Sequence, residues 1–257
     1  MTCPLCGRAD GRVYLAGTGF RILRCPACGN GWTDPPPQAV AYEAEDFHGD
    51  TGHDAVASLT PNWARCVRRQ AALLTGGLRP GARVLEIGCG RGILLKEIAA
   101  LGFAVTGVEP SQAASAAARA AGLEVFTGYF PHADLTPPYD AVVLSQVLEH
   151  VPRPREFLRD VTRAAPGGRL LLVQANFRGL IPRLRPSRWY AWVPDQHFWH
   201  FTPRGLEEVV RAAGGDVAAV EHSRLDHPDN LLTRLTDWIP RLGDQFHLLA
   251  RLPAASA

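Results

Sequence analysis

Several features that define other classes of protein are missing from this chain. No apolar run reaches the roughly 20 residues that a membrane-spanning helix needs, and the N-terminus lacks the apolar core of a signal peptide. A surplus of positive charge is missing as well, because the formal net charge is only +2. These absences predict a cytoplasmic protein with no membrane partner, and they argue against nucleic acid as a partner.

The length and composition allow one ordinary domain with an appendage. Of the 257 residues, 46% are hydrophobic, which is enough for a substantial core. From Arg83 onward, strand-like runs alternate with helical patterns, which predicts a parallel sheet covered by helices on both faces. The expected strands cover residues 83–87, 104–109, 124–126, 141–144, 169–174, 216–221 and 245–251. The expected helices cover residues 62–74, 92–101, 111–121, 154–164 and 203–213.

A glycine-rich loop around residues 84–92 organises the rest of the prediction. Strand-like residues run into three glycines at alternate positions, Gly88, Gly90 and Gly92, and a helical pattern begins directly after them. Glycines let a backbone approach a ligand closely, and the N-terminus of the following helix favours an anionic group. The order strand, glycine turn, helix therefore predicts a cofactor site. The third glycine comes one residue too early for a dinucleotide fingerprint, which argues against NAD.

Residues 86–92 read E-I-G-C-G-R-G. This segment resembles the first motif of the class I S-adenosylmethionine (SAM) methyltransferases, E/D-x-G-x-G-x-G. The resemblance extends over roughly residues 83–253 and implies a doubly wound, Rossmann-like α/β fold with a seven-strand sheet whose last strand is antiparallel. It also implies that SAM is the cofactor, and that the residues binding it here include Glu86, Gly88, Cys89, Gly90 and Gly92.

Later positions complete the predicted cofactor site. Glu109 ends the second strand, nineteen residues after Gly90, where a carboxylate can accept hydrogen bonds from both ribose hydroxyls of a nucleoside. Pro110 follows it directly. The family places side chains against the adenine ring at the position of Phe130, although packing in the core would explain this residue equally well. Residues 139–151 resemble the family's fourth motif region, and this implies that Ser145 and Gln146 face the methionine part of the cofactor.

Four of the six cysteines lie in two knuckles near the N-terminus. Cys3 and Cys6 form one C-x2-C knuckle, Cys25 and Cys28 form the other, and a glycine follows each. Four thiolates at this spacing can close a tetrahedral shell around zinc with no open position for catalysis. The spacing therefore predicts a structural zinc ribbon over residues 1–33. Disulfide bonds are the alternative, although cytoplasmic proteins seldom keep them.

Residues 34–80 are expected to form a linker and an N-terminal helical cap. A run of three prolines, residues 35–37, predicts a stiff and extended break after the ribbon. The family often places residues like Tyr42 and Phe47 over the cofactor cleft, but a solvent-facing linker explains them equally well. Residues 221–244 form an irregular arm that could close one side of the acceptor pocket or contact a second subunit. The oligomeric state stays open.

Residues 81–257 form the predicted methyltransferase domain, with an insertion at 176–200 that is dense in aromatic residues and arginines. The insertion should shape the acceptor pocket, because loops beyond the carboxyl ends of the strands form the ligand crevice in such sheets. It ends with His197 and His200, just before a predicted helix start at Thr202. Either histidine could deprotonate an acceptor, with His197 preferred, or could satisfy backbone groups around the helix cap.

A Glu149-His150 pair follows the fourth strand. Ubiquinone-pathway O-methyltransferases carry a related Glu-x-x-Glu-His cluster, which has been linked to a divalent metal or to acid–base chemistry. Gln146 stands here in place of the first acid, and this substitution argues against a metal. His150 is therefore a third candidate base, unless the pair only orders the loop before Pro152.

Together these residues predict an enzyme that transfers the SAM methyl group to a sugar, a natural product or another metabolite, by O- or C-methylation. A sulfonium is already a strong electrophile, so the protein must mainly align the reacting atoms and remove a proton. An RNA methyltransferase could carry a similar ribbon, but the basic footprint and the tetrapeptide N/D-P-P-Y/F/W are missing. A non-catalytic interaction protein with a vestigial SAM fold is the other alternative, and the intact glycine loop with Glu109 argues against it.

Overall fold

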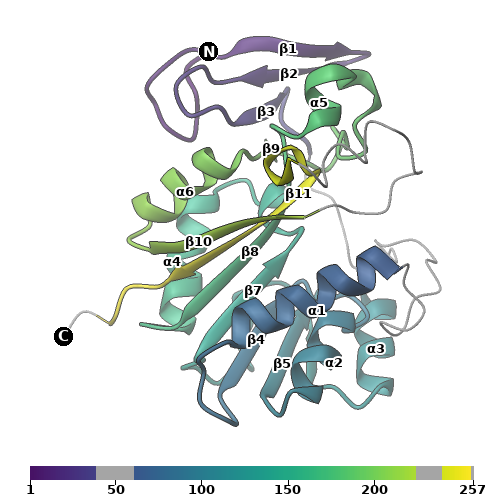
Figure 1. The fold of residues 1–257 in the computed structure, drawn as a ribbon, viewed down its shortest axis with the longest axis vertical. Coiled ribbons are helices and arrows are strands. Elements are labelled where there is room, and N and C mark those ends of the chain that lie inside the picture. The colour runs from purple at the N-terminus through teal and green to yellow at the C-terminus, as the bar shows by residue number, and fades with distance from the viewer. Residues whose placement is uncertain (39–60, 224–238, 256–257) are drawn as a thin grey trace.

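Two sheets organise the chain, as a computed structural model of residues 1–38, 61–223 and 239–255 shows (Figure 1). A small sheet is built mainly from N-terminal strands, and a seven-stranded sheet lies below it in Figure 1. The predictions for Tyr42 and Phe47, and for most of the arm at 221–244, fall outside the described residues. Within the described ranges, no helix is both long and apolar enough to cross a membrane.

The large sheet contains the seven strands expected from residue 83 onward, in the order β10-β11-β8-β7-β4-β5-β6. They are β4 (Arg83–Ile87), β5 (Ala104–Glu109), β6 (Val125–Thr127), β7 (Ala141–Ser145), β8 (Arg169–Ala175), β10 (Asp216–Ser223) and β11 (Gln245–Arg251). The central strands pair in parallel, whereas β11 runs antiparallel to both of its neighbours. The prediction of a Rossmann-like sheet with an antiparallel last strand is therefore confirmed.

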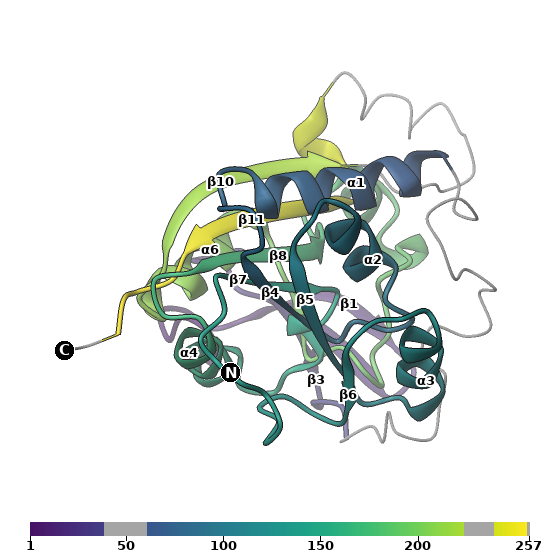
Figure 2. The same ribbon diagram turned by 90° about the horizontal axis from the view of Figure 1, so that it is seen from below.

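Aliphatic residues bury both faces of this sheet. On β4, Val84 faces a cluster with α1 (Pro61–Thr75) and α2 (Ile93–Ala100), while Leu85 faces α4 (Pro154–Ala164) and α6 (Pro203–Ala212). Alternation along a strand sends successive side chains to opposite faces, so a strand covered on both sides reads as a continuous apolar run. Figure 2 shows α1 and α2 on the face opposite α4 and α6. The remaining long helix, α3 (Gln112–Ala120), packs beside β5 and β6.

Short helices lie in the loops that leave the strands. The 3-10 helix η2 (Leu148–His150) follows β7, and η4 (Pro240–Leu242) precedes β11. The insertion after β8 contains α5 (Leu180–Leu184) and η3 (Pro186–Arg188). These loops bring irregular backbone to one end of the sheet, where ligands bind in folds of this type.

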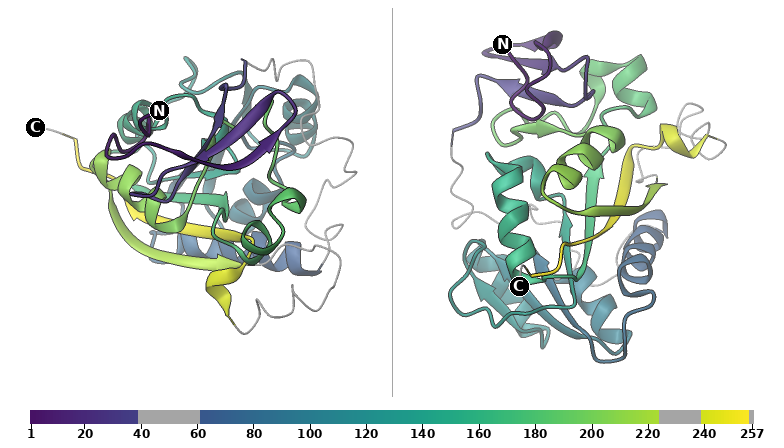
Figure 3. Two further views of the ribbon diagram at one scale, coloured as in Figure 1. Left: turned by 90° about the horizontal axis from the view of Figure 1, so that it is seen from above. Right: turned by 90° about the vertical axis from the view of Figure 1, so that its left-hand side faces the viewer.

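The small sheet joins the N-terminal ribbon to the insertion. Its order is β1-β2-β3-β9, with β1 (Arg12–Gly17), β2 (Phe20–Arg24), β3 (Gly31–Asp34) and β9 (Trp199–His200). Strand β9 belongs to the insertion and pairs antiparallel with β3, so that Trp32 lies opposite Trp199. A two-residue strand has no periodicity, and the sequence predictions do not include it. The small sheet consequently lies over the end of the large sheet where β7 and β8 finish (Figure 3).

The ribbon shares its core with the large sheet. Leu5, Cys25 and Trp32 belong to the same buried cluster as residues of α4 and α6. Arg8 pairs with Glu208 of α6, and Arg155 of α4 donates to the carbonyl oxygen of Leu5. The N-terminal module is therefore fixed against the larger domain over an apolar surface, rather than connected through its linker alone.

Candidate active site

The glycine loop joins β4 to α2 and is held by Glu109. Gly90 N donates to Glu109 Oε2 at 2.8 Å, and Ser111 N donates to Glu109 Oε1 at 2.8 Å. Two of the predicted cofactor residues, one in the loop after β4 and one at the end of β5, are thus in direct contact. The carboxyl ends of β4 and β5 form one site, as parallel pairing of neighbouring strands requires.

Two glycines of the loop have backbones and surroundings that exclude side chains. Gly88 has φ +71°, and a Cβ there would come within 2.6 Å of Val147 Cγ2. Gly92 has φ +77°, and a Cβ there would meet Leu123 Cδ1 at 2.3 Å. Gly92 is also the N-cap of α2 and provides no side-chain cap, which leaves the first turn of the helix open to an anionic group.

Buried polar atoms beside the loop fit the methionine part of SAM. Glu86 Oε2 and Gln146 Nε2 are buried and have no hydrogen-bond partner among the residues described. Burial, and then the charge of Glu109, raise the pKa of Glu86 well above its ordinary value. Gln146 also has φ 57°, which is rare outside glycine and typical of functional sites. The Glu86 oxygen can accept a hydrogen bond from an ammonium group, and the Gln146 nitrogen can donate one to a carboxylate. The methionine part of SAM carries both groups.

The other predicted cofactor residues have mixed surroundings. Ser145 is the half-buried last residue of β7, and Pro110 is a half-buried residue directly after β5. The ring of Phe130 meets that of Phe157 edge to face, with centroids 5.5 Å apart. This contact is part of core packing, and it does not conflict with a position of Phe130 beside the adenine ring. The thiol of Cys89 is buried against β5, where burial raises its pKa, so its side chain serves packing.

A second group of side chains gathers where β7 ends. Glu149 and His150 belong to η2, and His197 comes from the insertion. One ligand atom from each of the three lies within 4.8 Å of the others. The two imidazole rings meet edge to face with centroids 4.6 Å apart. This acceptor-side cluster, Glu149, His150 and His197, could share a proton or hold a divalent cation.

Burial sets the charge of the acceptor-side cluster. Desolvation raises the pKa of Glu149 to about 7, although Gln174 Nε2 donates to its carboxylate at 2.9 Å. Burial lowers the pKa of His197 to about 4, so this imidazole is neutral near pH 7. Its Nδ1 must carry the proton, because it lies 3.0 Å from the Ala191 carbonyl oxygen, which can only accept. The Nε2 of His197 therefore presents a lone pair.

His200 lies apart from this cluster, between the insertion and the ribbon. It is 2% exposed, and its Nε2 is 3.3 Å from Thr33 Oγ1. Burial lowers its pKa well below the ordinary value, so it is neutral. The structure thus brings two of the candidate bases, His150 and His197, together and places the third in the contact between β9 and β3.

The four ribbon cysteines form a pocket of sulfur atoms. Cys3 Sγ is 3.8 Å from Cys28 Sγ, and Cys6 Sγ is 3.6 Å from Cys25 Sγ. A tetrahedral zinc with Zn–S bonds of about 2.3 Å places its sulfurs about 3.8 Å apart, whereas a disulfide needs about 2.05 Å. None of the six cysteines, all within the described residues, forms a disulfide bond. The geometry therefore fits a zinc ion and does not fit the disulfide alternative.

Comparison with known families agrees with the geometry of the cofactor loop. Residues 60–220 match the family model described as a methyltransferase domain. The chain belongs to this family. The prediction of a class I SAM-dependent methyltransferase with a Rossmann-like fold is confirmed.

Individual relatives match parts of this methyltransferase. A ubiquinone biosynthesis O-methyltransferase of Caulobacter sp. (strain K31) is 42% identical over 134 residues, which cover 46% of this chain and 52% of that protein. A protein of the same name from Caulobacter vibrioides is 34% identical over 151 residues, covering 54% and 60%. The chain thus spans little more than half the length of these relatives.

Solved structures show the same fold. Magnesium protoporphyrin IX methyltransferase from Synechocystis, with bound SAH, superposes with a TM-score of 0.56 at 19% identity, covering 73% of this chain and 82% of that one. At this identity the likeness concerns the fold alone.

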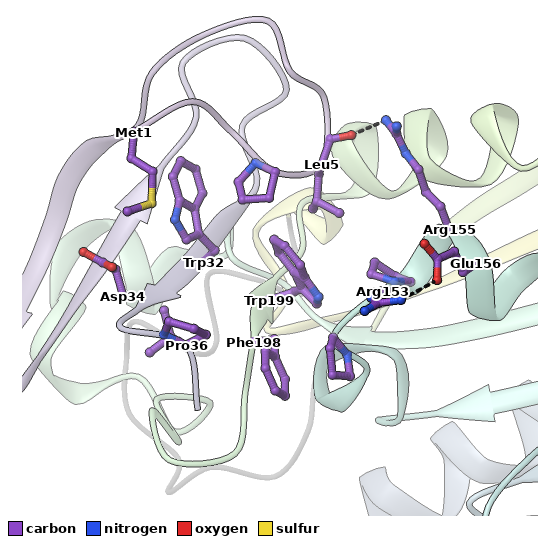
Figure 4. Close-up of a pocket in the computed structure, with 14 residues that line it drawn as sticks. Met1, Leu5, Trp32, Asp34, Pro36, Arg153, Arg155, Glu156, Phe198 and Trp199 are labelled. Atoms are coloured by element: carbon purple, nitrogen blue, oxygen red, sulfur yellow. Dashed lines mark hydrogen bonds and ion pairs between the residues drawn. The ribbon is translucent and has the colours of Figure 1, made fainter. Parts of the chain in front are cut away.

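A pocket of about 540 Å³ lies where the methyltransferase domain meets the ribbon (Figure 4). Trp32 of β3 faces it together with Phe198 and Trp199 of the insertion, and prolines complete much of the wall. Thr33, another lining residue, donates to the carbonyl oxygen of His197 at 2.7 Å. This junction pocket has the size and aromatic lining of small-molecule sites, and it backs onto the acceptor-side cluster.

Most of the other aromatic residues in the insertion pack against the ribbon. Trp189 is buried and stacks on Phe177 with ring centroids 5.8 Å apart, and Trp192 contacts Trp189 at 4.6 Å. Tyr14 of β1 meets Phe177 edge to face at 4.9 Å. These rings attach the insertion to the small sheet, while Phe198 and Trp199 face the junction pocket.

Two polar residues of the site are missing from the sequence predictions. Gln174 is buried and binds Glu149, and a signal for it exists, because it is a polar residue at the carboxyl end of an aliphatic strand. Thr33 has no comparable signal. Its partner His197 is 164 residues away, and no local pattern connects the two.

Proposed function

We propose that this protein transfers a methyl group from SAM to a hydroxyl group of a small molecule, such as a sugar, a natural product or another metabolite. The similarity to proteins named as ubiquinone biosynthesis O-methyltransferases supports the reaction class. The observation that carries the proposal is the position of the acceptor-side cluster. Val147 packs against Gly88 of the cofactor loop, and η2 with Glu149 and His150 begins at the next residue.

The cofactor would be held along the carboxyl ends of β4, β5 and β7. Glu109 would accept from the ribose hydroxyls, and the backbone of Gly88, Gly90 and Gly92 would approach the methionine part. Glu86, Ser145 and Gln146 would complete that end, with Phe130, Pro110 and the backbone of Cys89 toward the nucleoside. When bound, SAM would supply an electrophilic methyl group on its sulfonium.

His197 would accept a hydrogen bond from the acceptor hydroxyl through Nε2, because its Nδ1 faces the Ala191 carbonyl oxygen. Methyl transfer forms a carbon–oxygen bond and breaks the carbon–sulfur bond, so the hydroxyl proton must leave to the protein. Because the pKa of His197 is about 4, the proton comes to rest on Glu149, whose pKa is about 7. His150 would bridge the two, and His200 would support His197 from the ribbon side.

One zinc ion per chain would complete the ribbon. The sulfur spacing and the four-cysteine set support a structural ion without an open coordination position.

The test is incubation with labelled SAM against a metabolite extract and against total RNA in parallel. Wild-type protein should label a small molecule. Glu149→Gln and His197→Ala should lower the rate by roughly a hundredfold, the usual contribution of a general base, whereas His222→Ala on β10 should not. Label found in RNA would replace the small molecule by RNA as the substrate. Full activity in both Glu149→Gln and His197→Ala would show that the reaction needs neither residue as a base.

A further inference from the structure

Thr33 of the ribbon is hydrogen-bonded to the segment that carries His197. Its hydroxyl donates to the His197 carbonyl oxygen at 2.7 Å, and its N–H donates to the Phe198 carbonyl oxygen at 3.1 Å. The residue is 2% exposed, so water does not compete for these bonds. Strand β3 therefore holds two consecutive carbonyl groups, those of His197 and Phe198.

Two further hydrogen bonds of His197 are made within its own loop. Its ring Nδ1 donates to the Ala191 carbonyl oxygen at 3.0 Å, and its N–H donates to the Val193 carbonyl oxygen at 2.7 Å. The next N–H, that of Phe198, donates to the Glu149 carbonyl oxygen at 2.8 Å. Thr33 is thus the ribbon residue that binds the His197 carbonyl oxygen, next to the pairing of Trp32 with Trp199, while η2 contacts the segment from the other side.

The knuckle leaves little freedom for Thr33 itself. Cys25 N donates to the Asn30 carbonyl oxygen at 2.9 Å, which closes the turn around the second pair of cysteines. The fully buried Asn30 side chain accepts from Thr202 N at 2.9 Å. A Cβ at Gly31 would come within 2.8 Å of the Phe177 ring. Residues 30–33, which lead from the second knuckle to Thr33, are all buried, so the position of Thr33 is fixed relative to the cysteines.

We infer that Thr33 is a positioning residue for His197, so that the four-cysteine ribbon is a structural part of the acceptor side of the active site. The inference rests on the proposed function, because it concerns how the acceptor's hydrogen-bonding partner is placed. Removing the hydroxyl frees the His197 carbonyl, and a small displacement of a reacting group costs rate more than it costs cofactor binding. The cofactor loop lies on other strands and should be unaffected.

The experiment compares Thr33→Val, Thr33→Ser and Thr75→Val. Thr75 is the matched control, because its buried hydroxyl also donates to a backbone carbonyl oxygen, that of Ala71 at 2.8 Å, outside both parts of the site. Thr33→Val should lower kcat roughly ten- to a hundredfold with KM for SAM and zinc content unchanged. Thr33→Ser should restore most of kcat, and Thr75→Val should keep the wild-type value.

Wild-type kcat in Thr33→Val would overturn the inference, and so would failure of Thr33→Ser to restore it. An equal loss of SAM affinity would also overturn it, because that result indicates general destabilisation. Amide hydrogen exchange provides a readout that needs no acceptor: Thr33→Val should speed exchange at His197 and Phe198 but not at Gly90. If the wild-type protein methylates nothing, the proposed function fails, and unchanged exchange at these two amides would separately reject the role of Thr33.

Discussion

The proposed cofactor side and the proposed acceptor side of this methyltransferase are built in different ways. On the cofactor side, the contact between Gly90 and Glu109 joins residues 19 apart in the sequence, in the loop after β4 and at the end of β5, two strands that pair directly. On the acceptor side, the contact between Thr33 and His197 joins residues 164 apart, through a ribbon, an insertion and a two-residue strand. The first contact lies within one supersecondary unit, and the second depends on the assembly of segments from both ends of the chain.

This difference implies that the two sides can be damaged separately. Disturbing the ribbon should reduce turnover while SAM still binds, and disturbing the glycine loop or Glu109 should reduce SAM binding while the ribbon keeps its metal.

The largest effect is expected from loss of the zinc. Purified protein should contain one zinc per chain, and Cys25→Ser should lose it, because three thiolates and a hydroxyl bind zinc much more weakly than four thiolates. Residues 1–33 should then unfold and turnover should fall below detection, while calorimetry should show SAM affinity changed only slightly. Cys66→Ser, at a buried thiol outside the ribbon, is the control. Protein without zinc, or with disulfides found by mass spectrometry, would contradict the metal site.

Glu109→Ala should have the next largest effect, on the other side of the comparison. The ribose hydroxyls of SAM would lose charge-assisted hydrogen bonds of about 1.5–3 kcal/mol each. The Kd for SAM should therefore rise at least about tenfold. Zinc content should stay at the wild-type level. Glu124→Ala removes an exposed acid directly before the neighbouring strand β6 and should leave the Kd unchanged. Unaltered affinity in Glu109→Ala would remove this residue from the cofactor site.

The pH dependence of turnover should show which member of the acceptor-side cluster takes the proton. A carboxylate accepts a proton only when ionised, so kcat should rise with pH through about 7, the raised pKa of Glu149. Glu149→Gln should abolish this rise. A rise centred near pH 4 instead would assign the proton to His197 alone, whose pKa burial lowers to about 4.

The smallest effect concerns stability. The folded protein holds the Glu149 proton more tightly than the unfolded chain, whose glutamate pKa is about 4.3. The stabilising contribution is therefore complete below that pH and is lost as the pH rises through about 7. Glu149→Gln, which stays neutral, should lose less stability than the wild type between pH 5 and pH 8. Chemical unfolding at the two pH values measures this, and an identical loss in both proteins would contradict the burial of an ionisable Glu149.

The local motifs could be predicted because each is complete within a short stretch or a pair of adjacent strands. The glycine loop follows from alternate glycines between a strand and a helix, and Glu109 follows from its place at the end of the next strand. The C-x2-C spacing similarly fixes how close the thiolates in each knuckle can come, and aliphatic runs identify the central strands.

What the sequence by itself determined was therefore the α/β fold, and it also proposed the cofactor residues and the four zinc ligands, which remain predictions. Only the tertiary structure decided that β9 extends the ribbon, that His150 meets His197 while His200 faces Thr33, and that Glu149 is buried against Gln174. The physical reason is that burial and contact between distant segments depend on how elements pack. A histidine has the same intrinsic chemistry at every position, and its protonation and orientation are set by neighbours that the local sequence does not contain.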